Sequence, residues 1–501
     1  MRRGAIARAG AVLAAAAGLL LPAAAQKAGP VAPPPFMLRP PAVGPVPTYT
    51  PPARVRDQLP NGLRIVVVRD ARFPLVTAEL AVRGGSSLLT PAEAGLAEAE
   101  AKLLTAGTPT LNARQIAYAA DSLGGSISGS ADKDFLTVHA SSLATNVERM
   151  FALLADVALR PTFPESEVAL RKANMEQELR LERSEPDFLA RVQFYQLLYG
   201  DNPYAITAPT EASIAAISRA KLAAYHQRVF LPNNDATLVI VGDISEGLAR
   251  SLAQRYFGDW TFGSPPAPRF PPPPARPGRR IYLVDRPGSA QSVILLGNLG
   301  LERTAADYFP FLVANEVLGG SFNSRLVSDI REAKGYAYDI ASFNRPLLDG
   351  GAWQVVTEVR TAVTAPALAA TLAQLDRIRE AAVSGTELEQ AKNYLAGSFA
   401  RHLETQAEVA AEFLTVEEYG LPRDYLARFV PRTQAVNAAA ALAAAREHIR
   451  PDRALVVVVG DAHRIEASLT RYTSAPISIY NETGHFTGLY PPSGIRHIVK
   501  P

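Results

Sequence analysis

The sequence contains no cysteine among its 501 residues. This absence excludes disulfide bonds, zinc sites built from thiolates and a cysteine nucleophile. Histidine is also scarce: there are seven, and no two stand three to five residues apart, as zinc ligands on one helix do. His485 and His497 could meet only through a long loop. We therefore expect this chain to hold no metal.

An excess of charge is absent once the first residues are set aside. The formal net charge is +3, and Arg2, Arg3 and Arg8 account for all of it. The apolar run from Ala9 to Leu21 is shorter than the roughly 20 residues that a membrane-spanning helix needs. Because small residues follow this run, we expect residues 1–25 to be a cleaved signal peptide and the protein to be periplasmic or secreted, in a bacterium. The balance of charge gives no reason to expect binding to a nucleic acid or to an anionic membrane surface. We also expect no membrane span after cleavage.

Proline is concentrated in two stretches. Residues 30–52 hold ten prolines and residues 264–277 hold eight, a composition that favours extended, solvated chain. The second stretch divides the sequence into parts of similar size and would permit them to hinge. The organisation that we predict is a signal peptide (1–25), an extended arm (26–53), an N-terminal domain (54–262), a linker (263–278), a C-terminal domain (279–475) and an uninterpreted tail (476–501).

The two predicted domains resemble each other. Each ends with a helical pattern, a short turn with proline and aspartate, and a β-branched run that closes on Gly-Asp, at 237–243 and 455–461. Within each domain, strand patterns come first, helical periodicity follows, and a strand returns at the end. This segregation predicts an α+β fold of two similar domains, each an antiparallel sheet packed with helices.

The segment 84–108 carries a resemblance to a known family. Its glycine-rich strand end, the helical stretch after Gly95 and the closing Gly107-Thr108 resemble the active-site segment of the insulinase-type (M16) peptidases. The resemblance implies two domains of the LuxS/MPP-like metallohydrolase type. In that family the helix carries His-x-x-Glu-His, whose histidines bind zinc and whose glutamate activates the bound water.

The resemblance also implies that the zinc motif is lost. Its three positions hold Glu98, Ala101 and Lys102, while the last ligand of the family is matched by Glu178. Lysine repels a metal cation and alanine cannot accept a proton. We therefore expect no cofactor in this chain and a salt bridge from Glu178 to Lys102 in the vacated site.

The second domain retains a different part of the family pattern. The run 317–338 resembles the family's stretch with a Gly-Gly loop and an arginine and tyrosine seven residues apart, which act on substrate at the zinc. Arg331 and Tyr338 match that pair, and Gly319, Gly320 and Ser321 match the loop. The loop is shorter here than in the non-catalytic subunit of mitochondrial processing peptidase, a member of the family. A guanidinium and a phenol are suited to stabilise charge on a scissile carbonyl oxygen.

Three functions remain open from the sequence. The first is the Arg/Tyr-bearing subunit of an exported heterodimeric metallopeptidase, similar to the non-catalytic subunit of mitochondrial processing peptidase. Its partner would be a homologue with an intact His-x-x-Glu-His and its own zinc, and the two would enclose a peptide substrate. The second is an inert scaffold or peptide-binding pseudopeptidase, like the core subunits of the bc1 complex. The third is a metal-independent enzyme that uses Glu98, Glu100 and Glu178.

Overall fold

The computed structural model describes residue 44, residues 50–491 and residues 497–498. The predicted signal peptide and most of the predicted arm lie outside this range. No helix among the described residues is long and apolar enough to cross a membrane.

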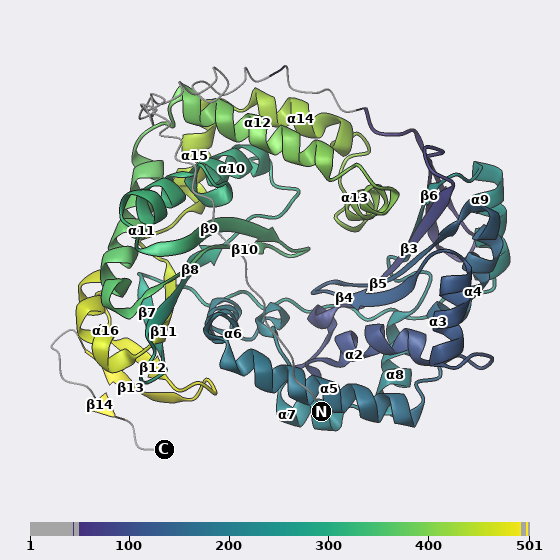
Figure 1. The fold of residues 1–501 in the computed structure, drawn as a ribbon, viewed down its shortest axis with the longest axis horizontal. Helices are drawn as coiled ribbons and strands as arrows, with labels where there is room; N and C mark the ends of the chain where they lie inside the picture. The colour runs from purple at the N-terminus through teal and green to yellow at the C-terminus, as the bar shows by residue number, and fades with distance from the viewer. Residues whose placement is uncertain (1–43, 45–49, 492–496, 499–501) are drawn as a thin grey trace, which may run out of the picture. The chain divides into compact units, whose positions relative to one another are not determined.

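The first half of the described chain builds a six-stranded sheet in the order β1-β2-β6-β3-β5-β4. Its strands are β1 (Arg54–Gln58), β2 (Arg64–Arg69), β3 (Leu75–Arg83), β4 (Ile127–Ala131), β5 (Phe135–Leu143) and β6 (Thr237–Gly242). Its α-helices are α2 (Leu96–Leu103), α3 (Ala113–Ser122), α4 (Val147–Leu159), α5 (Glu165–Ser184), α6 (Pro186–Tyr199), α7 (Glu211–Ala216), α8 (Arg219–Val229) and α9 (Glu246–Phe257). Figure 1 shows α4 and α9 along one face of this sheet.

The second half builds an eight-stranded sheet in the order β14-β13-β12-β7-β11-β8-β10-β9. Its strands are β7 (Arg280–Asp285), β8 (Gln291–Leu299), β9 (Ala337–Pro346), β10 (Gly351–Arg360), β11 (Leu455–Gly460), β12 (Ile477–Tyr480), β13 (Phe486–Tyr490) and β14 (His497–Ile498). Its α-helices are α10 (Tyr308–Asn315), α11 (Thr364–Glu380), α12 (Gly385–Arg401), α13 (Gln406–Glu418), α14 (Tyr425–Ala435), α15 (Ala438–His448) and α16 (Ala462–Leu469). Two π-helical segments, η6 (Glu316–Gly320) and η7 (Val327–Ala333), follow α10.

The two sheets repeat the same strand order. The series β2-β6-β3-β5-β4 corresponds to β7-β11-β8-β10-β9, and β6 and β11 are the repeated runs that end on Gly-Asp. The position beside β2 is filled by β1, whereas the position beside β7 is filled by β12 from the tail. The tail, which the sequence left uninterpreted, thus adds strands to the second sheet.

The α+β class is confirmed, but the sheets are mixed and not purely antiparallel. β6 pairs parallel to β2, and β11 pairs parallel to β7, while the other neighbours of β6 and β11 are antiparallel. Parallel pairing needs a long crossover connection. The segments 70–236 and 286–454, which contain α2–α8 and α10–α15, lie between the paired strands and supply it.

The central strands β6 and β11 are buried on both faces because each half contributes one helix that covers the sheet of the other half. α6 of the first half packs on β8 and β11 of the second sheet, and α13 of the second half packs on β3 and β6 of the first. Side chains of a strand alternate between its faces, so β6 contributes Leu238 and Ile240 to one core and Val239 and Val241 to the other. Both hydrophobic cores therefore contain residues of both halves.

The proline-rich linker is docked on the first half. Asn202 donates a 2.9 Å hydrogen bond to the carbonyl of Pro271, and the Phe270 ring stacks on Tyr204 with centroids 5.0 Å apart. Arg276 donates to the carbonyl of Leu198 at 2.9 Å. The composition alone predicted a solvated spacer, but these contacts and the exchanged helices tie the segment to the folded halves.

Candidate functional site

Helix α2, which the resemblance marks as the former zinc helix, begins at a required glycine. Gly95 has φ of 88°, in the left-handed region, and a Cβ there would lie 2.9 Å from side-chain atoms of both Met175 and Pro209. The carbonyl of Gly95 then accepts the first helical bond, from the N–H of Ala99. Glu98 therefore falls in the first turn.

The remaining motif positions of α2 point in different directions. Ala101 is buried beneath the edge strand β4, and a Cβ on Gly129 of that strand would lie only 2.1 Å from the Ala101 carbonyl oxygen. Lys102 is exposed. The strand and the helix are thus in backbone contact where the family's catalytic glutamate would stand.

A third residue joins Glu98 to Glu178. Arg171 lies on α5 two helical turns before Glu178, and its Nη1 donates a 3.0 Å hydrogen bond to Glu178 Oε1. Its Nη2 donates a 2.7 Å hydrogen bond to Glu98 Oε1. The Arg171 side chain is only 13% exposed, while the two carboxylates are about half exposed. A guanidinium therefore bridges the two carboxylates that correspond to metal-ligand positions.

The predicted salt bridge between Glu178 and Lys102 is wrong. Glu178 pairs with Arg171, which reaches it within the same helix, whereas the lysine side chain extends into solvent. The planar guanidinium has two N–H edges and can serve both carboxylates at once, which an ammonium does less well. One sequence feature could have indicated the pair of Arg171 and Glu178: they are seven residues apart, a spacing that places them on the same face of a helix.

These residues do not fit a zinc ion. The two carboxylates already accept hydrogen bonds from the Arg171 guanidinium. Within the described residues no group of three or more histidine, cysteine, aspartate or glutamate side chains could hold a metal ion. A catalytic zinc needs three protein ligands and an open position.

Glu100 faces away from Glu98. It is fully buried, and its Oε1 lies 2.9 Å from Nδ1 of His226, whose ring stacks on Phe230. Burial raises the pKa of Glu100, and His226 partly offsets that rise. The structure therefore places Glu100 in the core, apart from Glu98 and Glu178, although the third functional alternative grouped them.

The second half brings Arg331 and Tyr338 together. Arg331 lies in η7 and Tyr338 near the start of β9, and the Arg331 guanidinium carbon lies 5.0 Å from the Tyr338 ring centre. The same carbon lies 4.6 Å from the Phe322 ring centre. Tyr338 is 85% exposed and Phe322 is 62% exposed. The result is a cation in contact with two exposed aromatic rings.

The Gly-Gly loop packs where side chains would not fit. Gly319 and Gly320 end the π-helical segment η6, and a Cβ on Gly319 would lie 2.6 Å from Ser342 Oγ on β9. A Cβ on Gly320 would lie 2.4 Å from Glu316 Oε2. Ser321 follows in extended conformation and lines a small pocket with Phe322. Gly319 therefore sets how closely η6 approaches the strand of Tyr338, whereas Gly320 leaves room for the Glu316 side chain.

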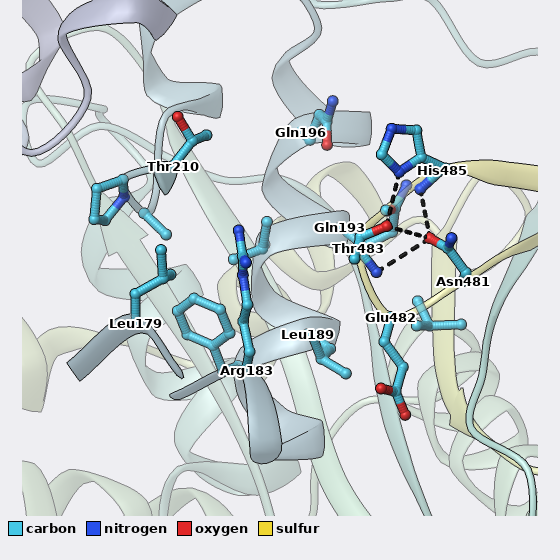
Figure 2. A pocket seen from close by; sticks show the side chains of 16 residues that line it. Leu179, Arg183, Leu189, Gln193, Gln196, Thr210, Asn481, Glu482, Thr483 and His485 are labelled. Carbon is cyan, nitrogen blue, oxygen red and sulfur yellow. Dashed lines mark hydrogen bonds between the residues drawn. The ribbon is translucent and has the colours of Figure 1, made fainter. Parts of the chain in front are cut away.

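The tail forms one wall of a pocket of about 430 Å³, opposite α5 and α6 (Figure 2). Thr483 Oγ1 lies 2.8 Å from Asn481 Oδ1 and 2.7 Å from His485 Nδ1, so these bonds shape the turn between β12 and β13. Arg183 lines the opposite wall and pairs with Glu211. The tail thus packs on helices of the first half.

The comparisons with known proteins match both halves. The model of the insulinase family, peptidase family M16, matches residues 64–208, and the model of the peptidase M16 inactive domain matches residues 216–395. The chain belongs to the M16 peptidase family. Within this M16 chain the zinc motif is missing, because Glu98, Ala101 and Lys102 stand at its positions.

Curated relatives cover most of this M16 chain. It is 26% identical over 354 residues to YmxG, an uncharacterized zinc protease of Bacillus subtilis, which spans 69% of this chain and 83% of that protein. It is also 26% identical over 357 residues to an uncharacterized zinc protease of Streptomyces coelicolor, spanning 70% and 77% of the two chains.

Solved structures share the fold. A peptidase M16 inactive domain from Pseudomonas fluorescens superposes with a TM-score of 0.76 at 26% identity, covering 81% of this chain and 98% of that one. A protease from Helicobacter pylori superposes with a TM-score of 0.75 at 19% identity, covering 82% and 100%. The two-domain α+β architecture is therefore that of M16 proteins.

Proposed function

We propose that this M16 chain is the zinc-less subunit of an exported metallopeptidase. It would bind a peptide and present Arg331 and Tyr338 to the zinc site of a partner M16 chain that has an intact His-x-x-Glu-His. The zinc would belong to that partner and would activate water there. The role of this chain's two side chains would be to donate hydrogen bonds to the carbonyl oxygen that gains charge.

The observation that carries the proposal is the contrast between the two sites. The former metal site is closed by Arg171, whereas Arg331 and Tyr338 lie in contact with each other and Tyr338 is 85% exposed. A tyrosine so exposed gains little from its own fold. A guanidinium and a phenol side by side suit an oxyanion contributed from outside the chain.

The test mixes purified subunits. The partner would be the M16 homologue with an intact zinc motif from the same organism, and cleavage of a quenched fluorescent peptide library would be followed. We expect each chain alone to cleave the peptides more slowly than the mixture does. Arg331→Ala or Tyr338→Phe should lower kcat of the mixture by roughly 100-fold or more, the cost of one oxyanion donor.

Two variants provide matched controls. Arg423→Ala removes an exposed arginine and Tyr118→Phe removes the hydroxyl of an exposed tyrosine on α3, both outside the segments that carry the pair. These should leave the mixed activity within about twofold. The proposal fails if Arg331→Ala and Tyr338→Phe behave like these controls while the subunits still associate.

One observation favours a second candidate, an inert peptide-binding scaffold. The Arg331 guanidinium lies over the rings of Phe322 and Tyr338, so its cation is already stabilised within this chain. Such stacking is worth about 0.5–1 kcal/mol at an exposed site. An unchanged mixed activity in the variants, with peptide binding retained, would favour this scaffold.

A further inference from the structure

A second cavity, of about 480 Å³, lies between elements of both halves. Its walls come from the loop between β4 and β5, from α6, from the chain between β8 and α10, from the end of β9 and from the residue after α13. The basic and hydroxyl groups that line it are Lys133, Arg191, Tyr195, Thr207, Arg303, Arg345 and Tyr419.

Two of its arginines form no salt bridge within the described part of the chain, although Glu412 and Glu418 interact with Arg303 at longer range. Neither Arg303 nor Arg345 forms an ion pair with a carboxylate of the described residues. Arg303 lies over the Tyr419 ring at 5.6 Å, and its Nε is buried without a hydrogen-bond partner. Arg191 has only a long contact of 3.6 Å to Asp187. A buried donor without an acceptor carries a desolvation cost that a bound acceptor would remove.

A buried tyrosine adds an unused donor. Tyr195 is 6% exposed and lines the cavity, while its ring packs against Phe194 and Tyr199. Its hydroxyl forms no hydrogen bond with any described residue. Buried tyrosine hydroxyls normally find a partner. This hydroxyl is therefore available to an acceptor that enters the cavity.

The acidic residues of the cavity do not cancel these donors. Asp134 accepts from Ser87, Tyr204 and the backbone N–H of Leu348. Asp132 accepts from two backbone N–H groups of its own turn.

Lys133 remains a cation at neutral pH. Its Nζ donates to the carbonyl of Ile206, and burial lowers its pKa to about 8. Donors and positive charge are thus in excess over acceptors inside the cavity.

We propose that this cavity binds a carboxylate of a peptide, with Arg303, Arg345 and the Tyr195 hydroxyl as its donors. The assignment to a peptide rests on the proposed function. Arginine holds carboxylates through paired N–H groups, and such charge-assisted bonds are about twice as strong as neutral ones.

The position of the cavity favours an extended chain as the ligand. β4 is the outermost strand of the first sheet, and its chain continues directly into Asp132 and Lys133 at the cavity. An extended peptide that adds to a free sheet edge forms backbone hydrogen bonds along it. A carboxylate on that peptide, either at its C-terminus or on a glutamate side chain, would then lie within reach of the arginines.

The test measures binding to this chain alone by fluorescence anisotropy. The probes are three fluorescein-labelled hexapeptides of alanine and valine: one with a free C-terminal carboxylate, one amidated, and one amidated with a single glutamate. We expect at least one carboxylate-bearing peptide to bind about tenfold tighter than the neutral amide. The tighter one identifies the source of the carboxylate.

Variants connect that preference to the cavity. Arg345→Gln changes an exposed residue, so this variant should fold normally. Arg345→Gln and Tyr195→Phe, each tested alone, should reduce the carboxylate preference to about twofold or less. Arg401→Gln, an exposed arginine outside the cavity, should retain it. Equal binding of all three peptides, or a preference that survives both cavity variants, overturns the inference. Since no partner and no cleavage are involved, failure here is distinct from failure of the proposed function.

Discussion

Arg171 donates a 2.7 Å hydrogen bond from Nη2 to Oε1 of Glu98, and so joins α5 to α2. A zinc ion in this place would be a cation held by both helices. Here the guanidinium supplies that charge from within the chain. Exposed ion pairs contribute only about 0–1 kcal/mol each, so its main effect is to occupy the space and the carboxylate oxygens.

Removal of Arg171 should open the site to a metal. The background is a double variant, Glu98→His and Lys102→His, which restores two ligands four residues apart beside Glu178. Adding Arg171→Ala to this background should tighten zinc binding at least about tenfold. The guanidinium would otherwise repel the ion and compete for Glu178. Isothermal titration calorimetry with zinc measures the difference. Arg180→Ala, on the exposed side of α5, is the control, and an equal gain in both would contradict the prediction.

The fold could be predicted from the sequence further than the site could. The repeated runs at 237–243 and 455–461 contain the central strands β6 and β11, and the helical stretch after Gly95 is α2. Local periodicity determines such elements. Arg171 was missed because its contact with Glu98 spans 73 residues of sequence. The pair Arg331 and Tyr338 was found because both stand in one continuous motif.

The pH dependence of stability should include a contribution from Glu316. Burial raises its pKa from 4.5 to about 7, and its residue is 5% exposed. The folded state therefore holds this proton more tightly than the unfolded state, so its contribution to stability is full below pH 4.5. It is lost as the pH rises from about 4.5 to about 7, which amounts to about 3 kcal/mol.

Glu316→Gln should remove that slope. Urea unfolding of the wild-type chain and the variant at pH 4.5, 6 and 7.5 measures it. As the pH rises, the free energy of unfolding of the wild type should fall relative to that of the variant. A difference that does not change with pH would show that the Glu316 carboxyl titrates normally.

The contact between the halves at Asp134 should be sensitive to a single hydroxyl. The hydroxyl of Tyr204 donates a 2.8 Å hydrogen bond to the buried Asp134 carboxylate, which also accepts from the N–H of Leu348. Tyr204→Phe should cost about 1.5–3 kcal/mol, as for a hydrogen bond to a charged group. Tyr199→Phe is a close control because the Tyr199 hydroxyl is buried without a partner, and it should cost nothing. Chemical denaturation compares them, and equal losses would contradict the prediction.

The backbone contact between β4 and α2 should not tolerate a side chain. Gly129→Ala would place Cβ 2.1 Å from the Ala101 carbonyl oxygen, so the edge strand must move, at a cost of about 1–3 kcal/mol. Gly247→Ala, on α9 with open space around it, should instead stabilise by about 0.5–1 kcal/mol. Thermal unfolding followed by circular dichroism distinguishes the two, and similar shifts in Tm would show that β4 relaxes freely.

The exchange of α6 and α13 between the sheets has a consequence for dissection of the chain. A fragment cut at the linker would leave each sheet with one bare face, since the helix that covers it is encoded in the other fragment. Neither piece is then an autonomous folding unit, and both would be aggregation-prone when expressed separately. Co-expressed, the two fragments carry all the covering helices needed to reassemble without the covalent connection.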